Sequence, residues 1–488
     1  MSVNGEFIQQ DKDYFFLEDD FRLDKLNEEC GVFGIFNRQG GNAARATYYA
    51  LYALQHRGQE SCGIAVNSDE NLVFHRDMGL VPEIFTEKIL NKLEGNVSIG
   101  HVRYSTAKEN IRENSQPMVI KYKNGKLALA HNGNLVNSNE IREKFEEEGV
   151  IFQSTIDSEL ILNLISRHRV TSSGIEEAII KTMQEIKGSY ALIMLSPRKL
   201  IGVRDPLGIR PLCIGMTEDG SHVLSSESCA LDAVGARFLR DVNPGEIVVI
   251  TEEGLNSIQT KVPNESKLCI FEHIYFARPD SYIDGASVYR ARIEAGRRLA
   301  IEHPVDADLV IGVPDSGLTA ALGFSQQSGI PYGMGILKNR YVGRTFIQPE
   351  EGQREKFVKI KLNAIKDVVN GKRLVMVDDS IVRGTTSRRI VEMLKEAGAT
   401  EVHMRVSSPP VKYPCFFGID ISNSSQLIAA KYSTEEICKM VGADSLGYLS
   451  VEGLLKTPLG SKTGFCSACF EGKYPMEVPE NANNSSCG

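Results

Sequence analysis

Short apolar runs, separated by polar segments and glycines, characterise the first half of the chain. Apolar residues at helical spacing predict helices over residues 43–55 and 157–167. A short apolar alternation over residues 32–36 predicts a buried strand that starts at Cys30 itself. Further strands are predicted at residues 63–66, 98–102, 127–130, 190–195 and 246–250. This mixture indicates an α+β layered domain that extends to about residue 262.

The second half alternates strands with helices. Apolar runs predict strands at residues 308–313 and 373–377, and the second strand is followed by a loop and a helix over residues 387–397. Another strand is predicted at residues 401–406. A strand–helix–strand unit of this length predicts a parallel sheet. The polar, proline-containing segment 261–266 marks the boundary between the halves.

The composition supports a globular protein of more than one domain. At roughly 150 residues per domain, 488 residues suggest about three domains, and two large domains fit as well. No apolar run approaches the roughly 18 residues of a membrane span. The net charge of -8 opposes non-specific binding to nucleic acid or to an anionic membrane. The 10 cysteines are too few for a disulfide scaffold and favour the reducing cytoplasm.

The two ends of the chain differ from the rest. Residues 1–29 contain nine acidic and three basic residues, which is the wrong sign for a signal or transit peptide. Residues 471–488 form a C-terminal tail, which we expect to be mobile from Glu480 onward. Two domains, residues 30–262 and 263–470, are therefore expected between an acidic leader and this tail.

Several polar residues of the first half have alternative explanations when each is taken alone. Asn132-Gly133 is a common hairpin-turn sequence. Arg103 could form a surface ion pair, and Asp157 could cap a helix. Cys30 could be a small core residue. Composition and spacing alone do not decide between these possibilities and a catalytic site.

Five motifs taken together resemble the glutaminase domain of the N-terminal-nucleophile amidotransferases. They occur in the family's order at Glu29–Ile35, Gln55–Ser61, His101–Thr106, His131–Leu135 and Asp157–Glu159. The resemblance implies that residues 1–29 are a propeptide, whose removal makes Cys30 the nucleophile and its own α-amino group the general base. A free amino group titrates near ~7.7–8.0 and a thiol near ~8.5, so the two can exchange a proton at neutral pH.

The same resemblance assigns the other residues of this site. Asn132 and Gly133 would form the oxyanion hole, with glycine allowing a close approach of the substrate. Arg103 would bind the glutamine carboxylate and Asp157 its ammonium group, and Gly58 would belong to the substrate site. The sequence departs from the family at Lys108–Arg112, where a small, glycine-rich run is usual. This departure concerns how the loop closes over glutamine.

An acidic pair and a Gly-Thr loop stand out in the second half, within residues 375–387. A loop at a helix N-terminus offers N–H groups and hydroxyls to a phosphate, and adjacent carboxylates require hydroxyl donors or a cation. This run resembles the phosphoribosyl pyrophosphate signature of type I phosphoribosyltransferases. The resemblance implies a Mg²⁺ site at Asp378, Asp379 and Ser316. It also implies a substrate site at Arg383, Gly384, Thr385, Thr386 and Ser387, with Lys338, Arg340 and Arg344 on a closing loop.

Both halves, in this order, resemble the glutamine phosphoribosylpyrophosphate amidotransferase family over nearly all of residues 27–470. The resemblance implies an αββα N-terminal-nucleophile domain followed by an α/β type I phosphoribosyltransferase domain. It implies ammonia transfer from glutamine to C1 of phosphoribosyl pyrophosphate, the first committed step of purine synthesis. It also implies a cytoplasmic homotetramer, inhibited by purine nucleotides, with one Mg²⁺ per subunit and no nucleic-acid or membrane partner.

The cysteines need a separate explanation. Cys466-Ser467-Ala468-Cys469 is a C-x-x-C pair, and spacing alone leaves zinc and iron–sulfur equally open. The resemblance to cluster-containing family members implies one [4Fe–4S] cluster per subunit on Cys269, Cys415, Cys466 and Cys469. The remaining cysteines are expected to have no special role: Cys62, Cys213, Cys229, Cys438 and Cys487.

Two other functions stay open at this point. One is a glutaminase coupled to a different acceptor. The other is a non-catalytic regulator that binds phosphoribosyl pyrophosphate or an iron–sulfur cluster. The joint presence of Cys30, Asn132, Gly133 and Asp157 argues against the regulator.

Overall fold

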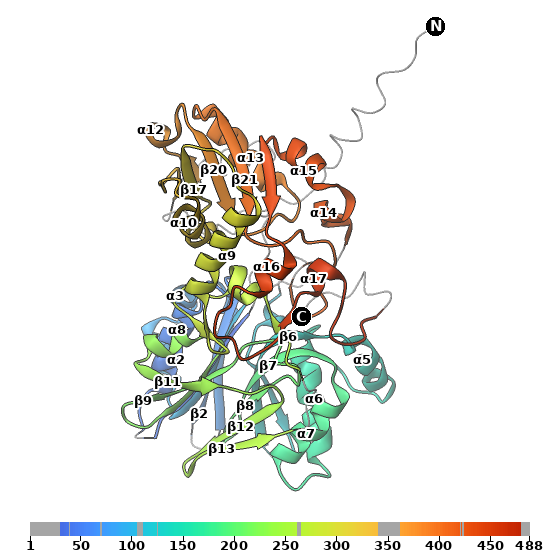
Figure 1. Ribbon diagram of the computed structural model, residues 1–488. Coiled ribbons are helices and arrows are strands. Elements are labelled where there is room, and N and C mark those ends of the chain that lie inside the picture. The colour runs from blue at the N-terminus through green and yellow to red at the C-terminus, as the bar shows by residue number, and fades with distance from the viewer. Residues whose placement is uncertain are drawn as a thin grey trace. The chain divides into compact units, whose positions relative to one another are not determined.

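The computed structural model describes residues 30–38, 40–68, 71–104, 111–123, 125–260, 265–339, 362–419, 421 and 424–479. These residues divide into two compact units (Figure 1). We call them the N-terminal unit (residues 30–291, with 413–421 and 458–479) and the C-terminal unit (residues 292–412 and 424–457). The leader, Arg340, Arg344 and the tail from residue 480 lie outside the described residues.

Two antiparallel sheets form the centre of the N-terminal unit. The first has seven strands in the order β11-β9-β10-β1-β4-β2-β3. Its strands are β1 (Gly31–Phe36), β2 (Ser61–Ser68), β3 (Asn71–Met78), β4 (Val97–Arg103), β9 (Cys213–Thr217), β10 (His222–Ser225) and β11 (Ala236–Asp241). The second has six strands in the order β13-β12-β8-β7-β6-β5. They are β5 (Met118–Tyr122), β6 (Gly125–Leu135), β7 (Gly188–Leu195), β8 (Leu200–Arg204), β12 (Glu246–Thr251) and β13 (Gly254–Gln259).

Helices cover the outer faces of both sheets, which gives four layers (Figure 1). Helices α2 (Ala43–Ala53) and α8 (Ser228–Ala233) pack on the first sheet. Helices α5 (Ser138–Glu147), α6 (Asp157–Arg169) and α7 (Ile175–Glu185) pack on the second. Strand β1 is apolar throughout because both of its faces are buried. Val32 and Phe36 face the second sheet, whereas Phe33 and Ile35 face the helices. The predicted αββα layering is confirmed.

The C-terminal unit is built on a parallel sheet of four strands in the order β17-β20-β21-β22. The strands are β17 (Leu309–Gly312), β20 (Arg373–Asp378), β21 (Glu401–Val406) and β22 (Ser445–Tyr448). Helix α13 (Thr385–Glu396) connects β20 to β21 and buries Ile390, Val391 and Leu394. The strand–helix–strand unit and the parallel sheet predicted from the sequence are confirmed.

Shorter elements complete the two units. In the N-terminal unit they are α3 (Val81–Ile84), α4 (Glu87–Leu90), η2 (Arg112–Asn114), β14 (Leu268–Cys269), η3 (Glu272–Phe276), β15 (Tyr282–Ile283), β16 (Ala286–Ser287), β23 (Phe465–Cys466) and α17 (Ala468–Glu471). Helix α9 (Val288–Glu302) spans the division between the units. The C-terminal unit adds α10 (Gly317–Ser328), β18 (Ile336–Lys338), β19 (Leu362–Ala364), α12 (Lys366–Val369), η4 (Ser424–Gln426), α14 (Ile428–Lys431), α15 (Thr434–Val441) and α16 (Val451–Leu455).

Three segments from beyond residue 262 pack in the N-terminal unit: residues 265–291, 413–421 and 458–479. Strand β14 pairs with β23 in parallel, and the Tyr474 hydroxyl donates a hydrogen bond of 2.8 Å to the Pro414 carbonyl. The compact units are therefore discontinuous in sequence. The domain boundaries expected at residues 262 and 470 therefore remain predictions.

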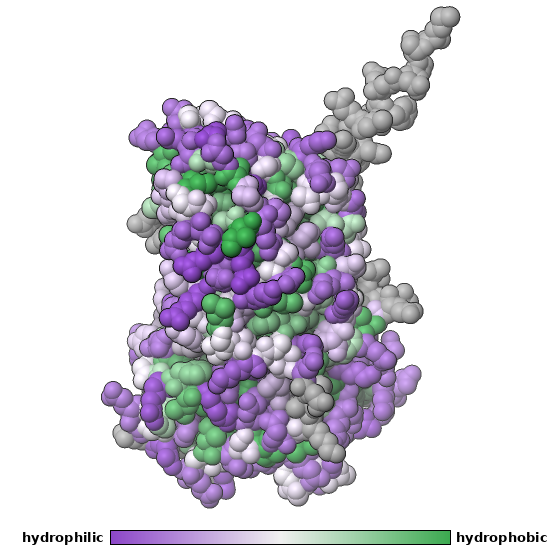
Figure 2. Space-filling view, viewed as in Figure 1, coloured by the Kyte–Doolittle hydropathy of each residue, from purple (hydrophilic) through white to green (hydrophobic). Residues whose placement is uncertain are grey.

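The surface is that of a typical globular chain. Figure 2 shows polar and charged residues over most of one face, with apolar residues in small separate areas. Within the part of the chain that the structure describes, no helix is long and apolar enough to cross a membrane.

Candidate functional site

Cys30 lies immediately before β1 and is 9% exposed. Its thiol donates a hydrogen bond of 3.8 Å to the Tyr104 carbonyl, and its own carbonyl accepts one of 3.1 Å from Arg57 Nε. Burial raises the pKa of the thiol, whereas the Tyr104 contact and the nearby cations Arg103 and Arg57 lower it. Cys30 is thus a sheltered thiol with two cations to stabilise its anion.

Asn132 and Gly133 lie inside β6, so the hairpin-turn alternative is wrong. Asn132 is 2% exposed, and its Nδ2 has no hydrogen-bond partner among the described residues. A buried amide donor of this kind is uncommon unless a ligand uses it. A Cβ on Gly133 would lie 2.1 Å from the Ser189 carbonyl oxygen of β7. Glycine is therefore required here by the neighbouring strand, a reason that differs from the one expected from the sequence.

The residues predicted to bind glutamine end or begin elements next to these strands. Arg103 ends β4 and is fully buried. A Cβ on Gly58 would come within 2.6 Å of the Arg103 backbone, so glycine allows the two segments to touch. Asp157 opens α6, and its Oδ2 accepts a hydrogen bond of 2.7 Å from the Leu135 N–H at the end of β6.

A buried histidine contact joins the two sheets at this point. His101 Nε2 donates to the His131 carbonyl over 3.0 Å. These residues stand two positions before Arg103 and one before Asn132, so the contact brings the two motifs together. Burial lowers the pKa of His101 to about 3 and that of His131 to about 4. Both rings are neutral at physiological pH and position the backbone. Both histidines begin motifs that the sequence shows, but the motifs alone do not indicate this contact.

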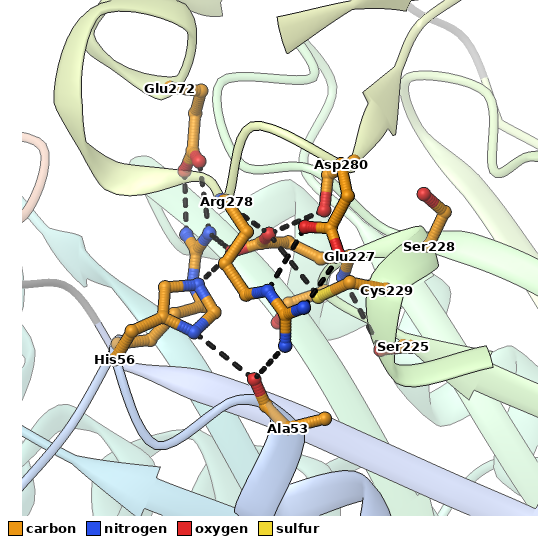
Figure 3. Close-up of polar contacts among 12 residues, drawn as sticks. Ala53, His56, Ser225, Glu227, Ser228, Cys229, Glu272, Arg278 and Asp280 are labelled. Carbon is orange, nitrogen blue, oxygen red and sulfur yellow. Dashed lines mark hydrogen bonds and ion pairs between the residues drawn. The ribbon is translucent and has the colours of Figure 1, made fainter. Parts of the chain in front are cut away.

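A buried charge network contains the carboxylates of Glu227 and Glu272 (Figure 3), and Arg57 pairs with both of them. Its guanidinium pairs with both oxygens of Glu272 over 2.7 and 3.0 Å and also with Glu227. Burial opposes the charge of Arg57, but the two carboxylates outweigh this effect and raise its pKa. Glu227 also accepts hydrogen bonds from His56 and Ser281. Only the position of Arg57 within the Gln55–Ser61 motif could have indicated this network from the sequence.

The acidic pair of the C-terminal unit stands at the end of β20. Asp378 is 1% exposed and Asp379 is fully buried. Asp379 accepts hydrogen bonds from the hydroxyls of Ser316 and Ser380, and the Asp379 N–H donates to Asp378 over 2.9 Å. Ser316 is the N-cap residue of α10, and the next residue is Gly317. A Cβ on Gly317 would lie 2.4 Å from the Val377 carbonyl, so glycine allows α10 to approach β20 closely. The structure thus brings the three predicted Mg²⁺ ligands close together. All three offer oxygen atoms, the donors that Mg²⁺ prefers.

The loop that follows leads into α13. Gly384 has a φ of +86° and is the N-cap residue, and a Cβ there would meet Ile428 at 2.9 Å. Thr385, Thr386 and Ser387 form the first turn, where backbone N–H groups point out of the helix and can bind phosphate. Arg383 donates to Gln426 over 2.7 Å. Lys338, at the end of β18, pairs with Asp315.

All four predicted cluster cysteines lie in the N-terminal unit. Cys269 stands opposite Cys466 in the β14–β23 pair. The Cys469 carbonyl accepts a hydrogen bond of 3.0 Å from the Tyr413 N–H, next to the Cys415 segment. Burial raises the pKa of each thiol, and Cys415 adds to this effect at Cys269, Cys466 and Cys469. Three segments thus bring four thiols into electrostatic contact, those of Cys269 and Cys469 buried and those of Cys415 and Cys466 half-buried.

The donor chemistry of these thiols suits an iron–sulfur cluster. Among the described residues, no group of three or more His, Cys, Asp or Glu side chains is placed to hold one metal ion. Four thiolates are equally the ligands of structural zinc sites, so the donor set by itself fits either zinc or a cluster.

Comparisons with known proteins were consistent across the chain. A family model described as a glutamine amidotransferase domain matches residues 101–233. The amidophosphoribosyltransferase of Synechocystis sp. is 52% identical over 95% of this chain and 94% of its own length. That of Bacillus subtilis is 50% identical over 93% of this chain and 95% of its own.

Two solved structures also match. One, of the allosteric regulatory enzyme of purine biosynthesis, has a TM-score of 0.88 and 49% identity over 93% of this chain and 97% of that chain. The other, glutamine phosphoribosylpyrophosphate amidotransferase from Bacillus subtilis complexed with ADP and GMP, has a TM-score of 0.87 and 49% identity. It covers 93% of this chain and 98% of that chain. These matches confirm the predicted fold class of both domains.

Proposed function

The chain belongs to the amidophosphoribosyltransferase family, and on this basis we propose which of its residues perform each step. The enzyme transfers ammonia from glutamine to C1 of phosphoribosyl pyrophosphate and yields 5-phosphoribosylamine, pyrophosphate and glutamate, for purine synthesis. The predicted function and enzyme class are confirmed by relatives about half identical over nearly the whole chain, which also argues against a different acceptor.

Cys30 is the nucleophile of the glutaminase step. Its thiolate attacks the side-chain amide of glutamine, ammonia leaves, and water hydrolyses the resulting thioester. The observation that carries this assignment is the buried, unpartnered Asn132 amide among the described residues, a donor available to the oxyanion. The Gly133 N–H is the second donor. Removal of residues 1–29 supplies the free α-amino group that acts as base.

Arg103, Asp157 and Gly58 bind glutamine. The buried Arg103 guanidinium suits a carboxylate, because a bidentate pair is strongest where water is excluded. One oxygen of Asp157 accepts a hydrogen bond from Leu135, which ends the strand that carries Asn132. This contact orients the carboxylate for the ammonium group. These residues select glutamine and do not take part in the bond changes.

The C-terminal unit binds phosphoribosyl pyrophosphate. Asp378 and Asp379 hold the ribose hydroxyls, and with Ser316 they would hold Mg²⁺. When bound, Mg²⁺ neutralises charge on the departing pyrophosphate. The loop of Arg383, Gly384, Thr385, Thr386 and Ser387 binds the 5′-phosphate at the start of α13. Lys338 binds the pyrophosphate, together with Arg340 and Arg344, which lie outside the described residues.

Glutamine hydrolysis is expected to depend on phosphoribosyl pyrophosphate. Ammonia released without an acceptor would be protonated in water and lost, so hydrolysis should follow binding of the activated sugar. We expect glutamate release by the processed enzyme to rise at least about tenfold when phosphoribosyl pyrophosphate and Mg²⁺ are added. Ribose 5-phosphate, which lacks the pyrophosphate, is the control. Equal hydrolysis with and without phosphoribosyl pyrophosphate would contradict the coupling.

Cys269, Cys415, Cys466 and Cys469 hold a [4Fe–4S] cluster. The mutual electrostatic influence of these thiols and the burial of Cys269 and Cys469 support this assignment. Anaerobically purified protein should contain about four iron and four sulfide per chain. Cys466→Ser should lose most of the iron, whereas Cys438→Ser, at a half-buried thiol bonded to the Ala443 carbonyl over 3.2 Å, should keep it. A colourless wild-type protein that contains zinc, or no metal, would contradict the cluster.

Several properties follow from the family. The structure of the Bacillus subtilis relative complexed with ADP and GMP supports feedback by purine nucleotides. We further propose a homotetramer, a cytoplasmic location and domains at residues 30–262 and 263–470, with the leader 1–29 removed and residues 471–488 as the tail.

A further inference from the structure

Arg57 connects the backbone of Cys30 to two buried carboxylates. Its Nε donates to the Cys30 carbonyl over 3.1 Å, while its two terminal nitrogens face Glu272 over 2.7 and 3.0 Å. Arg57, Glu227 and Glu272 each have fully buried side chains. Because a guanidinium is planar, a two-point contact at one edge fixes the direction of the Nε–H at the other. The orientation of the Cys30 peptide therefore depends on where Glu272 is held.

Glu272 is held by the part of the chain that contains the four cysteines. It opens η3, three residues after Cys269. Its Oε1 lies 4.0 Å from Arg210 Nη1. Arg210 in turn donates to the Phe417 carbonyl, and the Phe417 N–H donates to Cys415 Sγ over 3.4 Å.

The backbone is shaped to admit the Arg210 guanidinium. A Cβ on Gly418 would lie 2.4 Å from Arg210 Nη2, and this residue has a φ of +110°. On the Arg210 side, Asp205 holds the backbone in place by accepting hydrogen bonds from the N–H groups of Ile209 and Arg210. The Cys269 N–H also donates to the Ile209 carbonyl over 3.1 Å. Arg210 is thus tied to the Cys415 segment and to Glu272, and its neighbour Ile209 is tied to Cys269.

We propose that Glu272 and Arg210 are positioning residues of the glutaminase reaction, which hold Arg57 against the Cys30 carbonyl and link the geometry of the nucleophile to the four-cysteine segment. The inference rests on the proposed function, in which Cys30 is the nucleophile. The chain of contacts runs from Cys415 through Phe417, Arg210, Glu272 and Arg57 to Cys30. Each step is a hydrogen bond or charge contact within the N-terminal unit, and all are buried except the partly buried bond between Phe417 and Cys415.

The test is Glu272→Gln in the full, processed chain. Glutamine has nearly the same shape, but it turns one N–H₂ group toward Arg57 and removes the charge, so the two-point contact is lost. We expect alkylation of Cys30 by iodoacetamide, followed by mass spectrometry of its peptide, to slow by about 10-fold or more, and kcat for glutamine to fall similarly. KM for glutamine should change by less than about twofold, because Arg103 and Asp157 are untouched. Iron content and ammonia-dependent synthesis should equal those of the wild type.

Arg278→Gln is the matched control. Arg278 belongs to the same network (Figure 3), where it pairs with Asp280 and reaches the Ala53 carbonyl. It is 40% exposed at the side chain, and its replacement should leave alkylation and kcat within about twofold of the wild type. Should Glu272→Gln fail to fold, Arg210→Lys keeps the charge but loses the planar fork, and about a threefold or larger fall in both rates is expected.

Three outcomes are decisive. Wild-type alkylation and kcat in Glu272→Gln, or in Arg210→Lys if that variant is the one that folds, would overturn the proposal. Equal losses in Arg278→Gln would also overturn it, because the effect would then be general to the network. The proposed function fails separately, if Cys30→Ala keeps its glutaminase activity.

Discussion

Replacing Cys30 with alanine is expected to abolish glutamine-dependent synthesis of phosphoribosylamine, with a fall in kcat of at least about 1,000-fold. The variant lacks the thiol that we propose attacks the amide, and among the described residues the histidines of the neighbouring motifs, His101 and His131, are buried and neutral. Synthesis from a high concentration of ammonium at alkaline pH should continue, because the acceptor site that we propose lies in the C-terminal unit. Both activities are measured as pyrophosphate release.

The control for this experiment is Cys62→Ala. Cys62 is fully buried in β2, packs in the core between the first sheet and its helices, and has no assigned role in the reaction. This variant should keep both activities within a few-fold of the wild type, since the change removes a single sulfur atom. Cys30→Ala that still hydrolyses glutamine at more than a tenth of the wild-type rate would contradict the assignment of the nucleophile.

Asp379→Asn is expected to lower synthesis from glutamine and from ammonia alike, by about 100- to 1,000-fold. The carboxylate accepts hydrogen bonds from the hydroxyls of Ser316 and Ser380, and an amide can accept only through its oxygen. The variant also removes one of the two negative charges available to Mg²⁺. Activation of glutamine hydrolysis by phosphoribosyl pyrophosphate should disappear, whereas alkylation of Cys30 should remain at the wild-type rate.

Asp367→Asn provides the matched comparison, because Asp367 lies exposed on α12 in the same unit. It should retain both activities. If Asp379→Asn lost only the glutamine-dependent reaction, the acidic pair would not be part of the phosphoribosyl site.

Local elements were predictable from the spacing of apolar residues, whereas contacts between distant residues were predictable only where the family resemblance supplied them. The strand after Cys30 and the helix after the Gly-Thr loop follow from local apolar spacing, and the structure places them at Gly31–Phe36 and Thr385–Glu396. The Arg57 network joins residues separated by 170 and 215 positions, which no local pattern encodes. Strands β14 and β23 have two residues each and are too short to show a period. Glycine is required at position 133 because β7 lies against it, and the sequence alone does not show that β7 is its neighbour.

The return of residues 413–421 to the N-terminal unit has a consequence for the order of folding during synthesis. Asn134 Nδ2, one residue beyond Gly133, donates to the Phe416 carbonyl over 2.9 Å, and Ser189 Oγ donates to the Phe417 carbonyl over 2.7 Å. Strand β6, which carries Asn132 and Gly133, and strand β7 are thus bound by a segment that leaves the ribosome 282 and 228 residues later, respectively. Translation must nearly finish before the glutaminase site is complete, so a polypeptide released early at residue 262 would carry the nucleophile but not its finished surroundings.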